Sequence, residues 1–265
     1  MIEEHWGLLR KPFANTPDPV FVYHSPVFDE GFARLLYDVT DLRGGLSLVT
    51  GEIGCGKTML VEALRARLAA TAYEPWVVDY PRLTGAQLLQ FVADAASLPN
   101  PPKSKPALVG ALRERLAELH AAGRRPVLIV DEAQLASPSL LEELRLLTNF
   151  EDRTDKHLHV VLLGQPELRE RIVKRPQIDQ RVSLRFHLDP LDADDVREYV
   201  RHRLRVAGAA HEIFTLDALA ALAARSGGVP RVVNNLAMQA LFVGAMRGLP
   251  RVDERLVHDV ADDRQ

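Results

Sequence analysis

The chain has 265 residues, of which 47% are hydrophobic and 26% charged, a balance typical of a globular protein and not of a disordered one. This length accommodates one large domain, or a large domain and a small one. The net charge of −3 excludes a general attraction to nucleic acid or to an anionic membrane, although a local basic face is compatible with it. The single cysteine excludes an internal disulfide framework and fits a reducing compartment.

The first residues, Met1-Ile2-Glu3-Glu4-His5-Trp6, lack the basic and apolar regions of a signal peptide. The sequence also contains no apolar stretch of about 18 residues, so we expect no membrane span and a cytoplasmic location. Residues 1–28 are rich in proline and aromatic residues, which predicts an ordered but largely irregular N-terminal arm.

Residues 29–189 alternate between apolar runs and helical spacing. Apolar runs predict strands, and the last of these segments alternates apolar and polar residues as an edge strand does: 46–50, 76–80, 126–130, 159–163 and 182–188. Helices are predicted over 27–42, 57–71, after the capping residue Thr84, and over 106–122, 138–149 and 166–174. Right-handed crossovers then give an α/β fold, an αβα sandwich around a five-stranded parallel sheet.

Beyond residue 190 the pattern predicts helices only. The expected helices cover 193–207, 216–226, 230–246 and about 253–262, with Asp192 and Thr215 as caps and Pro230 in a first turn. The predicted organisation is therefore an arm over 1–28, a core domain over 29–189 and a C-terminal helical lid over 190–265.

The segment between the first predicted strand and the next helix carries the most specific motif of the chain. Gly51-Glu52-Ile53-Gly54-Cys55-Gly56-Lys57-Thr58 fits G-x-x-x-x-G-K-[ST], the phosphate-binding P-loop. Its glycines allow backbone N–H groups to surround a polyphosphate, and the helix that follows with Met59 adds its positive dipole. Lys57 is expected to reach the β- and γ-phosphates, and the Thr58 hydroxyl to hold Mg²⁺.

A second motif, Asp131-Glu132, follows the continuous apolar strand 126–130. Ligands of parallel sheets bind beyond the carboxyl ends of the strands, where these two carboxylates are expected to lie. We expect Asp131 to act in the coordination shell of Mg²⁺, and Glu132 to polarise a water molecule for attack on the γ-phosphate. The glutamate favours hydrolysis over nucleotide binding alone.

Three further polar residues are candidates for contact with the γ-phosphate. Gln165 follows the strand 159–163 and is either a sensor between the two motifs or part of a surface turn. Arg181 precedes the edge strand, where an arginine can reach the nucleotide of a neighbouring subunit; Arg175 and Arg185 are the competing candidates. Arg231 lies in a first helical turn, where the helix dipole disfavours a cation, so a phosphate is its natural partner.

Together, these motifs resemble those of a known family, the AAA+ ATPases of the ExeA/GspA type, which includes the soluble MshM-like proteins of type IV pilus systems. Residues 164–168 resemble the sensor-1 region, Gln180-Arg181-Val182 the finger region and Gly228-Val229-Pro230-Arg231 the start of the sensor-2 helix. The arm is the most specific part of the resemblance: Trp6-Gly7-Leu8, Pro12-Phe13, Thr16-Pro17-Asp18-Pro19 and Tyr23-His24-Ser25.

The resemblance implies an AAA+ P-loop NTPase of the ASCE class that hydrolyses ATP with Mg²⁺ and forms homo-oligomers, as rings or short spirals with a finger in trans. It implies a role in assembling or remodelling a secretion or type IV pilus machine through protein partners. An alternative is a transposition ATPase of the TniB, MuB or TnsC kind, which binds DNA in the presence of ATP. ExeA-type proteins continue into a transmembrane helix and a peptidoglycan-binding region, so this chain corresponds to a short soluble member or to an excised cytoplasmic domain.

Overall fold

A computed structural model describes residues 2–153 and 155–263 of the chain. The chain divides into two compact units, each with its own hydrophobic core. One unit, here the sheet unit, comprises Glu30–Gly51 and Leu60–His187. The other, here the helical unit, comprises Met1–Asp29, Glu52–Met59 and Leu188–Gln265.

The sheet unit is built around the five-stranded sheet that the sequence predicts, with the strand order β2-β3-β4-β1-β5. Its strands are β1 (Leu46–Gly51), β2 (Tyr73–Val78), β3 (Arg125–Val130), β4 (His159–Gly164) and β5 (Leu184–Leu188). β4 lies between β1 and β3 and pairs with both in parallel. The carboxyl ends of β1, β4 and β3 therefore meet at one edge of the sheet.

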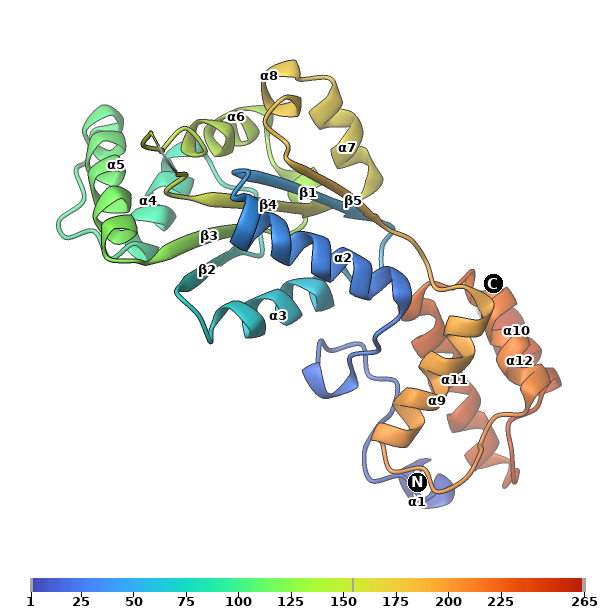
Figure 1. Cartoon of the computed structure of the whole chain (residues 1–265). Helices are drawn as coiled ribbons and strands as arrows, with labels where there is room; N and C mark the ends of the chain where they lie inside the picture. The colour runs from blue at the N-terminus through green and yellow to red at the C-terminus, as the bar shows by residue number, and fades with distance from the viewer. Residues whose placement is uncertain (1, 154, 264–265) are drawn as a thin grey trace. The chain divides into compact units, whose positions relative to one another are not determined.

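Helices cover both faces of this sheet (Figure 1). They are α2 (Pro26–Tyr37), α3 (Lys57–Leu68), α4 (Gly85–Ala95), α5 (Lys105–Ala121), α6 (Pro138–Leu147), α7 (Pro166–Val173) and the short α8 (Pro176–Asp179). Leu128 and Val130 of β3 pack in one cluster with residues of α4, α5, α6 and α7. The alternate residues Val127 and Ile129 point to the opposite face, which α2 and α3 cover, and they are equally buried.

Several elements differ from the predicted ranges, and two of them show the reason. The second strand was expected over 76–80 but spans Tyr73–Val78, because it pairs residue by residue with β3, which ends at Val130. The helix expected over 27–42 ends as an α-helix at Tyr37 and continues as one π-helical turn, Asp38–Leu42. Hydrophobic spacing does not locate such ends, because tertiary pairing decides them.

Side-chain caps begin several helices where the sequence places them. Thr84 accepts a hydrogen bond from the Gln87 backbone N–H and its own N–H donates to the Gln87 side chain, a complete capping box. In the helical unit Asp192 caps α9 (Ala193–Val206) and Thr215 caps α10 (Leu216–Ser226). The remaining helices of this unit are α11 (Pro230–Met246) and α12 (Glu254–Asp262). The predicted caps are thus confirmed.

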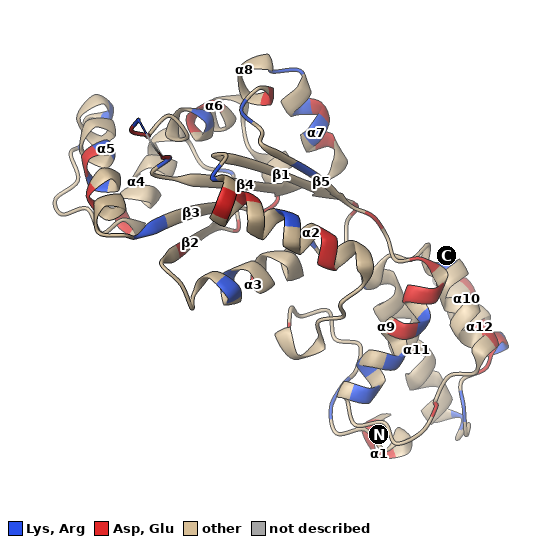
Figure 2. Cartoon of the chain, in the orientation of Figure 1, with Lys and Arg blue, Asp and Glu red and all other residues tan. Residues whose placement is uncertain are grey.

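Charges of both signs share the same helices, and Figure 2 shows this on α5, α7 and α9. In α9, Asp194 and Asp195 occupy the first turn, and Arg203 and Arg205 the last. This order complements the helix dipole. The charges at the two ends of α9 therefore contribute to the stability of this helix. Among the described residues, no helix combines the length and the apolar character that a bilayer crossing requires.

The N-terminal arm packs on the helices of its own unit. It begins with a short helix, α1 (Ile2–Trp6), whose Trp6 ring is 2% exposed and donates its indole N–H to the Leu241 carbonyl at 2.9 Å. Phe13 and Phe21 join the same core. Burial of aromatic rings is favourable when their polar atoms are hydrogen-bonded, as the Trp6 indole N–H is. The arm therefore forms part of the hydrophobic core of the helical unit.

Arg203 of α9 fastens the arm from within. Its guanidinium donates to the carbonyl oxygens of Pro12 (2.6 Å) and Ala14 (3.0 Å), and the residue is 4% exposed. The same group lies over the rings of Phe21, at 4.8 Å, and Tyr199, at 5.5 Å. A charge is tolerated here because hydrogen bonds and aromatic faces replace its water.

We predict that Arg203→Ala lowers the free energy of unfolding of the helical unit by about 2–4 kcal/mol, because it leaves two arm carbonyls without donors and removes the cation from two rings. The chain has two tryptophans, and Trp6 belongs to the helical unit. Denaturant unfolding followed by Trp6 fluorescence in a Trp76→Phe background measures the change. The exposed neighbour Arg205→Ala is the control, with an expected change within about 0.5 kcal/mol. Equal stabilities of the two variants would contradict this role of Arg203.

Candidate functional site

The P-loop follows β1 directly and leads into α3. Gly54 and Gly56 adopt φ angles of +87° and +104°, which side chains of L-residues rarely allow. These two conformations curl the backbone between the end of β1 and Lys57. The glycines that the sequence motif requires are therefore used for the backbone shape on which phosphate binding depends.

Two side chains of the P-loop, those of Cys55 and Lys57, are buried. Lys57 is 5% exposed, and its ammonium donates to the Glu52 carbonyl oxygen at 2.9 Å, among its other interactions. Cys55 is also buried, and this desolvation raises the pKa of its thiol despite the nearby charge of Lys57. A raised pKa disfavours the thiolate, which is the nucleophilic form of cysteine, and burial favours a packing role for Cys55.

Arg231 lies beside the P-loop. Its backbone N–H, in the first turn of α11, donates to the Gly54 carbonyl at 3.3 Å. A Cβ atom on Gly54 would lie 2.6 Å from the Cβ of Arg231 and 3.3 Å from a methyl carbon of Val229. The helical unit thus brings together two motifs that are far apart in the sequence, and the Arg231 side chain remains exposed there.

The acidic pair lies at the carboxyl edge of the sheet, directly after β3. Asp131 is 6% exposed, and one of its carboxylate oxygens accepts a hydrogen bond from the Glu132 backbone N–H at 2.8 Å. Glu132 adopts a left-handed backbone conformation with φ 50° and ψ 35°, which is uncommon for a residue with a side chain. Such conformations cost about 1–3 kcal/mol and are concentrated at functional sites.

Gln134 is a site residue that the sequence analysis missed. Its side-chain amide donates to a carboxylate oxygen of Glu132, and its side-chain oxygen accepts from the backbone N–H of Gln165 at 3.1 Å. It thereby connects the acidic pair after β3 with the residue after β4. The sequence shows that Gln134 follows the acidic pair closely, but no local pattern in the sequence indicates the direction of its side chain.

Gln165 occupies the N-cap position of α7, immediately after β4. The preceding Gly164 pairs in register with Thr50, the residue before the P-loop motif begins. A Cβ atom at Gly164 would lie 2.7 Å from the Gln134 side-chain oxygen, so the glycine leaves room for the bridging glutamine. Asp131, Glu132 and Gln165 thus share one edge of the sheet unit.

The three arginines considered as a finger have different surroundings. Arg185 pairs with the Asp179 carboxylate at 2.8 Å, and Arg175 donates to the Arg171 carbonyl at 2.7 Å. No hydrogen bond or ion pair of the Arg181 side chain occurs among the described residues. Arg181 is therefore the finger candidate whose guanidinium is least engaged by its own subunit.

Arg181 lines a polar cavity of about 590 Å³ in the sheet unit. Arg145 and Lys156 also line it, and each of these two pairs with a glutamate, Glu142 and Glu151 respectively. Burial and the charge of Arg181 lower the pKa of the Lys156 ammonium. The cavity wall thus carries more positive than negative charge, as a receptor for an anionic group does.

Comparison with known proteins places this geometry in a family. The sequence profile of the AAA domain family matches residues 41–172, a range that includes the P-loop, Asp131, Glu132 and Gln165. The general secretion pathway protein A of Aeromonas hydrophila is 40% identical over 256 residues, which is 95% of this chain. The match covers 46% of that protein, so the chain spans about half the length of this relative.

Solved structures share the fold at lower identity. Cdc6p of Pyrobaculum aerophilum superposes with a TM-score of 0.72 and 16% identity, over 93% of this chain and 70% of that one. The ORC1 protein of Aeropyrum pernix, solved in complex with DNA, superposes with a TM-score of 0.69 and 22% identity, over 96% of this chain and 69% of that one. RuvB of Thermotoga maritima superposes with a TM-score of 0.59 and 16% identity, over 96% of this chain and 73% of that one. Such likenesses establish the fold and leave function to the site.

The fold and the matching motifs define the class: the chain is an AAA+ protein with a P-loop NTPase sheet and a helical C-terminal region. Within this class, the identity along nearly the whole chain makes it an AAA+ ATPase of the ExeA/GspA type.

We predict that Gly54→Ala lowers the free energy of unfolding of the helical unit by about 2–4 kcal/mol, because the new methyl group meets Arg231 at a φ angle that disfavours it. Gly248→Ala is the matched control, since its φ is +64° but a Cβ there meets no atom within 4 Å. The control should cost only the backbone strain, about 1 kcal/mol. The Trp6 fluorescence assay measures both. Equal losses in the two variants would show that the packing of Gly54 on Arg231 contributes nothing.

Proposed function

We propose that this protein binds and hydrolyses ATP with Mg²⁺. The observation that carries the proposal is the P-loop, in which Gly54 and Gly56 hold the left-handed conformations of a phosphate cradle. In this proposal, residues 51–58 and Met59 surround the phosphates, and Lys57 exchanges its bond with the Glu52 carbonyl for the β- and γ-phosphates.

The chain offers oxygen ligands suited to Mg²⁺, the hydroxyl of Thr58 and the carboxylate of Asp131. Magnesium is a hard cation that prefers oxygen and is commonly held by one or two protein groups together with phosphates and water. We assign Thr58 and Asp131 this role. When bound, the metal ion neutralises charge that develops on the phosphate oxygens.

Glu132 is the proposed general base. It is fixed by its strained backbone, by the bond from its N–H to Asp131 and by the amide of Gln134. Gln134 acts as a positioning residue, because it also binds the N–H of Gln165, the proposed γ-phosphate sensor. A change at the Gln134 side chain, or a shift of the Gln165 backbone, would then alter the direction of the Glu132 carboxylate.

Two arginines complete the proposed machinery. Arg231 contacts the P-loop through its backbone, which supports a role of its exposed side chain with the γ-phosphate. Arg181, which lines the positively charged cavity, acts on the nucleotide of a neighbouring copy. The protein would then work as a homo-oligomer, a ring or a short spiral, whose hydrolysis rate depends on assembly.

We propose a role in assembling or remodelling a secretion or type IV pilus machine, and the identity with general secretion pathway protein A supports the secretion role. We place this activity in the cytoplasm, where ATP is available and the single cysteine stays reduced. The mixed charge of the helices and the net charge of −3 do not favour DNA as a partner. An ATP-dependent gel shift that weakens steeply with salt would support the DNA alternative instead.

We predict that Glu132→Gln retains nucleotide affinity and lowers the rate of ATP hydrolysis by at least about 100-fold, because the amide cannot accept a proton from water. Lys57→Ala should lose nucleotide binding itself. A fluorescent ATP analogue measures binding, and phosphate release measures turnover. Multiple turnover at the wild-type rate by the Glu132→Gln variant would contradict the role of Glu132 as the general base.

We predict that Arg181→Ala binds ATP normally but loses the increase in turnover that accompanies rising protein concentration, by about tenfold or more. The exposed Arg169→Ala on the same unit is the control and should keep this increase. Phosphate release over a range of protein concentrations measures the effect. The same loss in Arg175→Ala or Arg185→Ala, with Arg181→Ala unaffected, would move the finger to that residue.

A further inference from the structure

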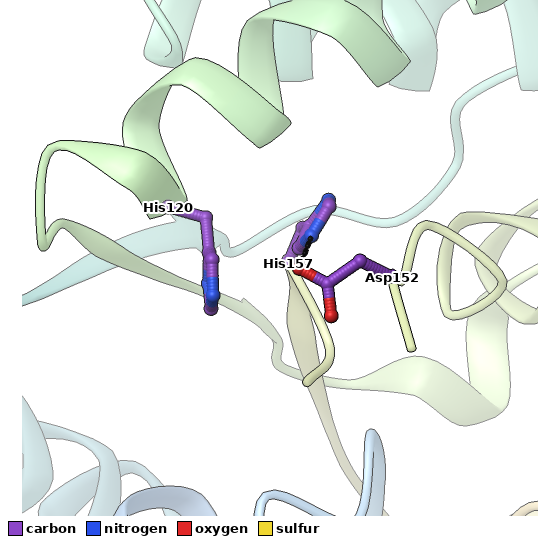
Figure 3. A group of neighbouring side chains, drawn as sticks. All are labelled: His120, Asp152 and His157. Atoms are coloured by element: carbon purple, nitrogen blue, oxygen red, sulfur yellow. Dashed lines mark hydrogen bonds and ion pairs between the residues drawn. The ribbon is translucent and has the colours of Figure 1, made fainter. Parts of the chain in front are cut away.

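Two histidines and an aspartate gather at the edge of the sheet unit opposite the acidic pair (Figure 3). His120 comes from the last turn of α5, whereas Asp152 and His157 lie in the segment before β4, where Glu151 and Lys156 form an antiparallel bridge. The six-residue strands β3 and β4 separate this amino edge from the carboxyl edge by about 20 Å. The cluster is therefore independent of the residues assigned to ATP.

The three side chains have the spacing of a metal site. One ligand atom of each lies within 4.8 Å of the others. The His157 Nε2 atom and an Asp152 carboxylate oxygen are 3.2 Å apart. Two ligands bound to Zn²⁺ at about 2.1 Å in a tetrahedron are about 3.4 Å apart, so this pair already has that separation. The rings of His120 and His157 lie 4.7 Å apart between centroids, close enough for a small rotation to bring both to one ion.

The histidines hold unsatisfied nitrogen atoms. The Nδ1 atoms of His120 and His157 are buried and have no hydrogen-bond partner among the described residues. The His157 side chain is 6% exposed and that of His120 15%. Buried polar atoms normally have partners. The Nδ1 atom of His120 lacks one that an ion would supply, whereas His157 faces Asp152 with its Nε2 atom.

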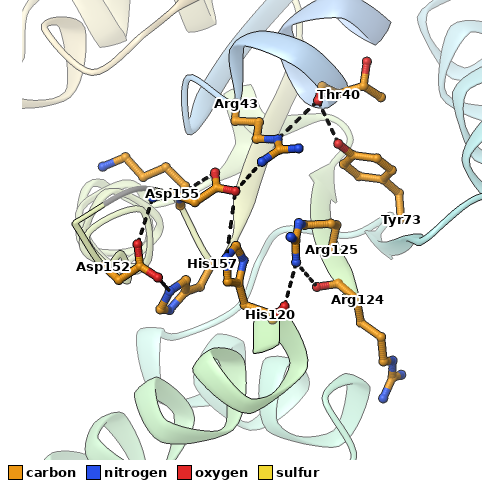
Figure 4. A network of polar contacts seen from close by, with 10 residues as sticks. Thr40, Arg43, Tyr73, His120, Arg124, Arg125, Asp152, Asp155 and His157 are labelled. Atoms are coloured by element: carbon orange, nitrogen blue, oxygen red, sulfur yellow. Dashed lines mark hydrogen bonds and ion pairs between the residues drawn. The ribbon is translucent and has the colours of Figure 1, made fainter. Parts of the chain in front are cut away.

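The surrounding contacts orient the cluster (Figure 4). One carboxylate oxygen of Asp152 accepts from the backbone N–H of Asp155 at 2.9 Å, which directs the other oxygen to His157. The Asp155 carboxylate pairs with Arg43 and lies 3.8 Å from His120 Nε2. Arg125 donates to the His120 carbonyl at 2.9 Å. Both neighbouring guanidinium groups are thus engaged by oxygen atoms, and contacts of this outer kind hold ligands in place.

We propose that His120, Asp152 and His157 bind a divalent transition-metal ion, with Zn²⁺ the best fit to two imidazoles and one carboxylate. Three protein ligands leave the fourth tetrahedral position to water. The ion would connect the end of α5 to the residues Asp152 and His157 that precede β4. Lys156, the neighbour of His157, lines the cavity of Arg181, so the metal site would lie next to one wall of this cavity.

Titration of the metal-free full-length chain tests the proposal, with Zn²⁺ followed by calorimetry and Co²⁺ by its visible absorption. Nucleotide is left out and Mg²⁺ is in excess, because Mg²⁺ prefers oxygen ligands and should not compete. We expect one ion per chain and the intense absorption of tetrahedral Co²⁺. Asp152→Asn keeps an oxygen for the Asp155 N–H but removes the charge, and should weaken binding by at least about tenfold.

His157→Gln should weaken binding at least as much as Asp152→Asn. His211→Ala, which removes an exposed histidine of the helical unit, is the control and should bind as the wild type does. Far-ultraviolet circular dichroism of the metal-free variants verifies that they are folded, and Asp152→Asn supplies the decisive comparison if His157→Gln does not fold. Wild-type chain that binds no ion, or binding that is equal in wild type and Asp152→Asn, would overturn the proposal.

Discussion

The parallel pairing of β4 with both β1 and β3 is the constraint on which the rest of the structure depends. Parallel strands point the same way, so the chain must leave all three at the same edge. The P-loop, the acidic pair and Gln165 each follow one of these strands. Chemistry-bearing residues from distant parts of the sequence therefore start from one edge of the sheet, and helices on both faces shield the strands from water.

Around this edge the backbone adopts costly conformations. Gly54 and Gly56 have no Cβ to oppose a positive φ, whereas Glu132 accepts a left-handed conformation with a full side chain. Its hydrogen bonds to Asp131 and Gln134 offset part of that cost. These contacts hold the proposed general base in place, which would reduce the reorganisation that the proposed hydrolysis requires.

The opposite edge of the sheet also brings together residues from separate segments of the chain. The turns that bring the chain back to the start of β3 and β4 place His120 beside His157, and Lys156 beside the cavity that Arg181 lines. No local pattern in the sequence indicates this cluster, because His120 comes from a different segment than Asp152 and His157. The sequence favoured Arg181 as the finger, with Arg175 and Arg185 as competitors, and in the folded chain these two competitors have partners of their own.

The sequence by itself determined the order and type of the elements, the capping residues Thr84, Asp192 and Thr215, and the P-loop with its acidic partner. These features are local, since periodicity, turn chemistry and short motifs act within a few residues. Tertiary structure alone decided the end of β2, the packing of Arg231 on Gly54, the bridge that Gln134 makes to Gln165, and the meeting of His120 with His157. Each of these depends on the path of the chain between distant segments and on side-chain directions, which no local pattern encodes.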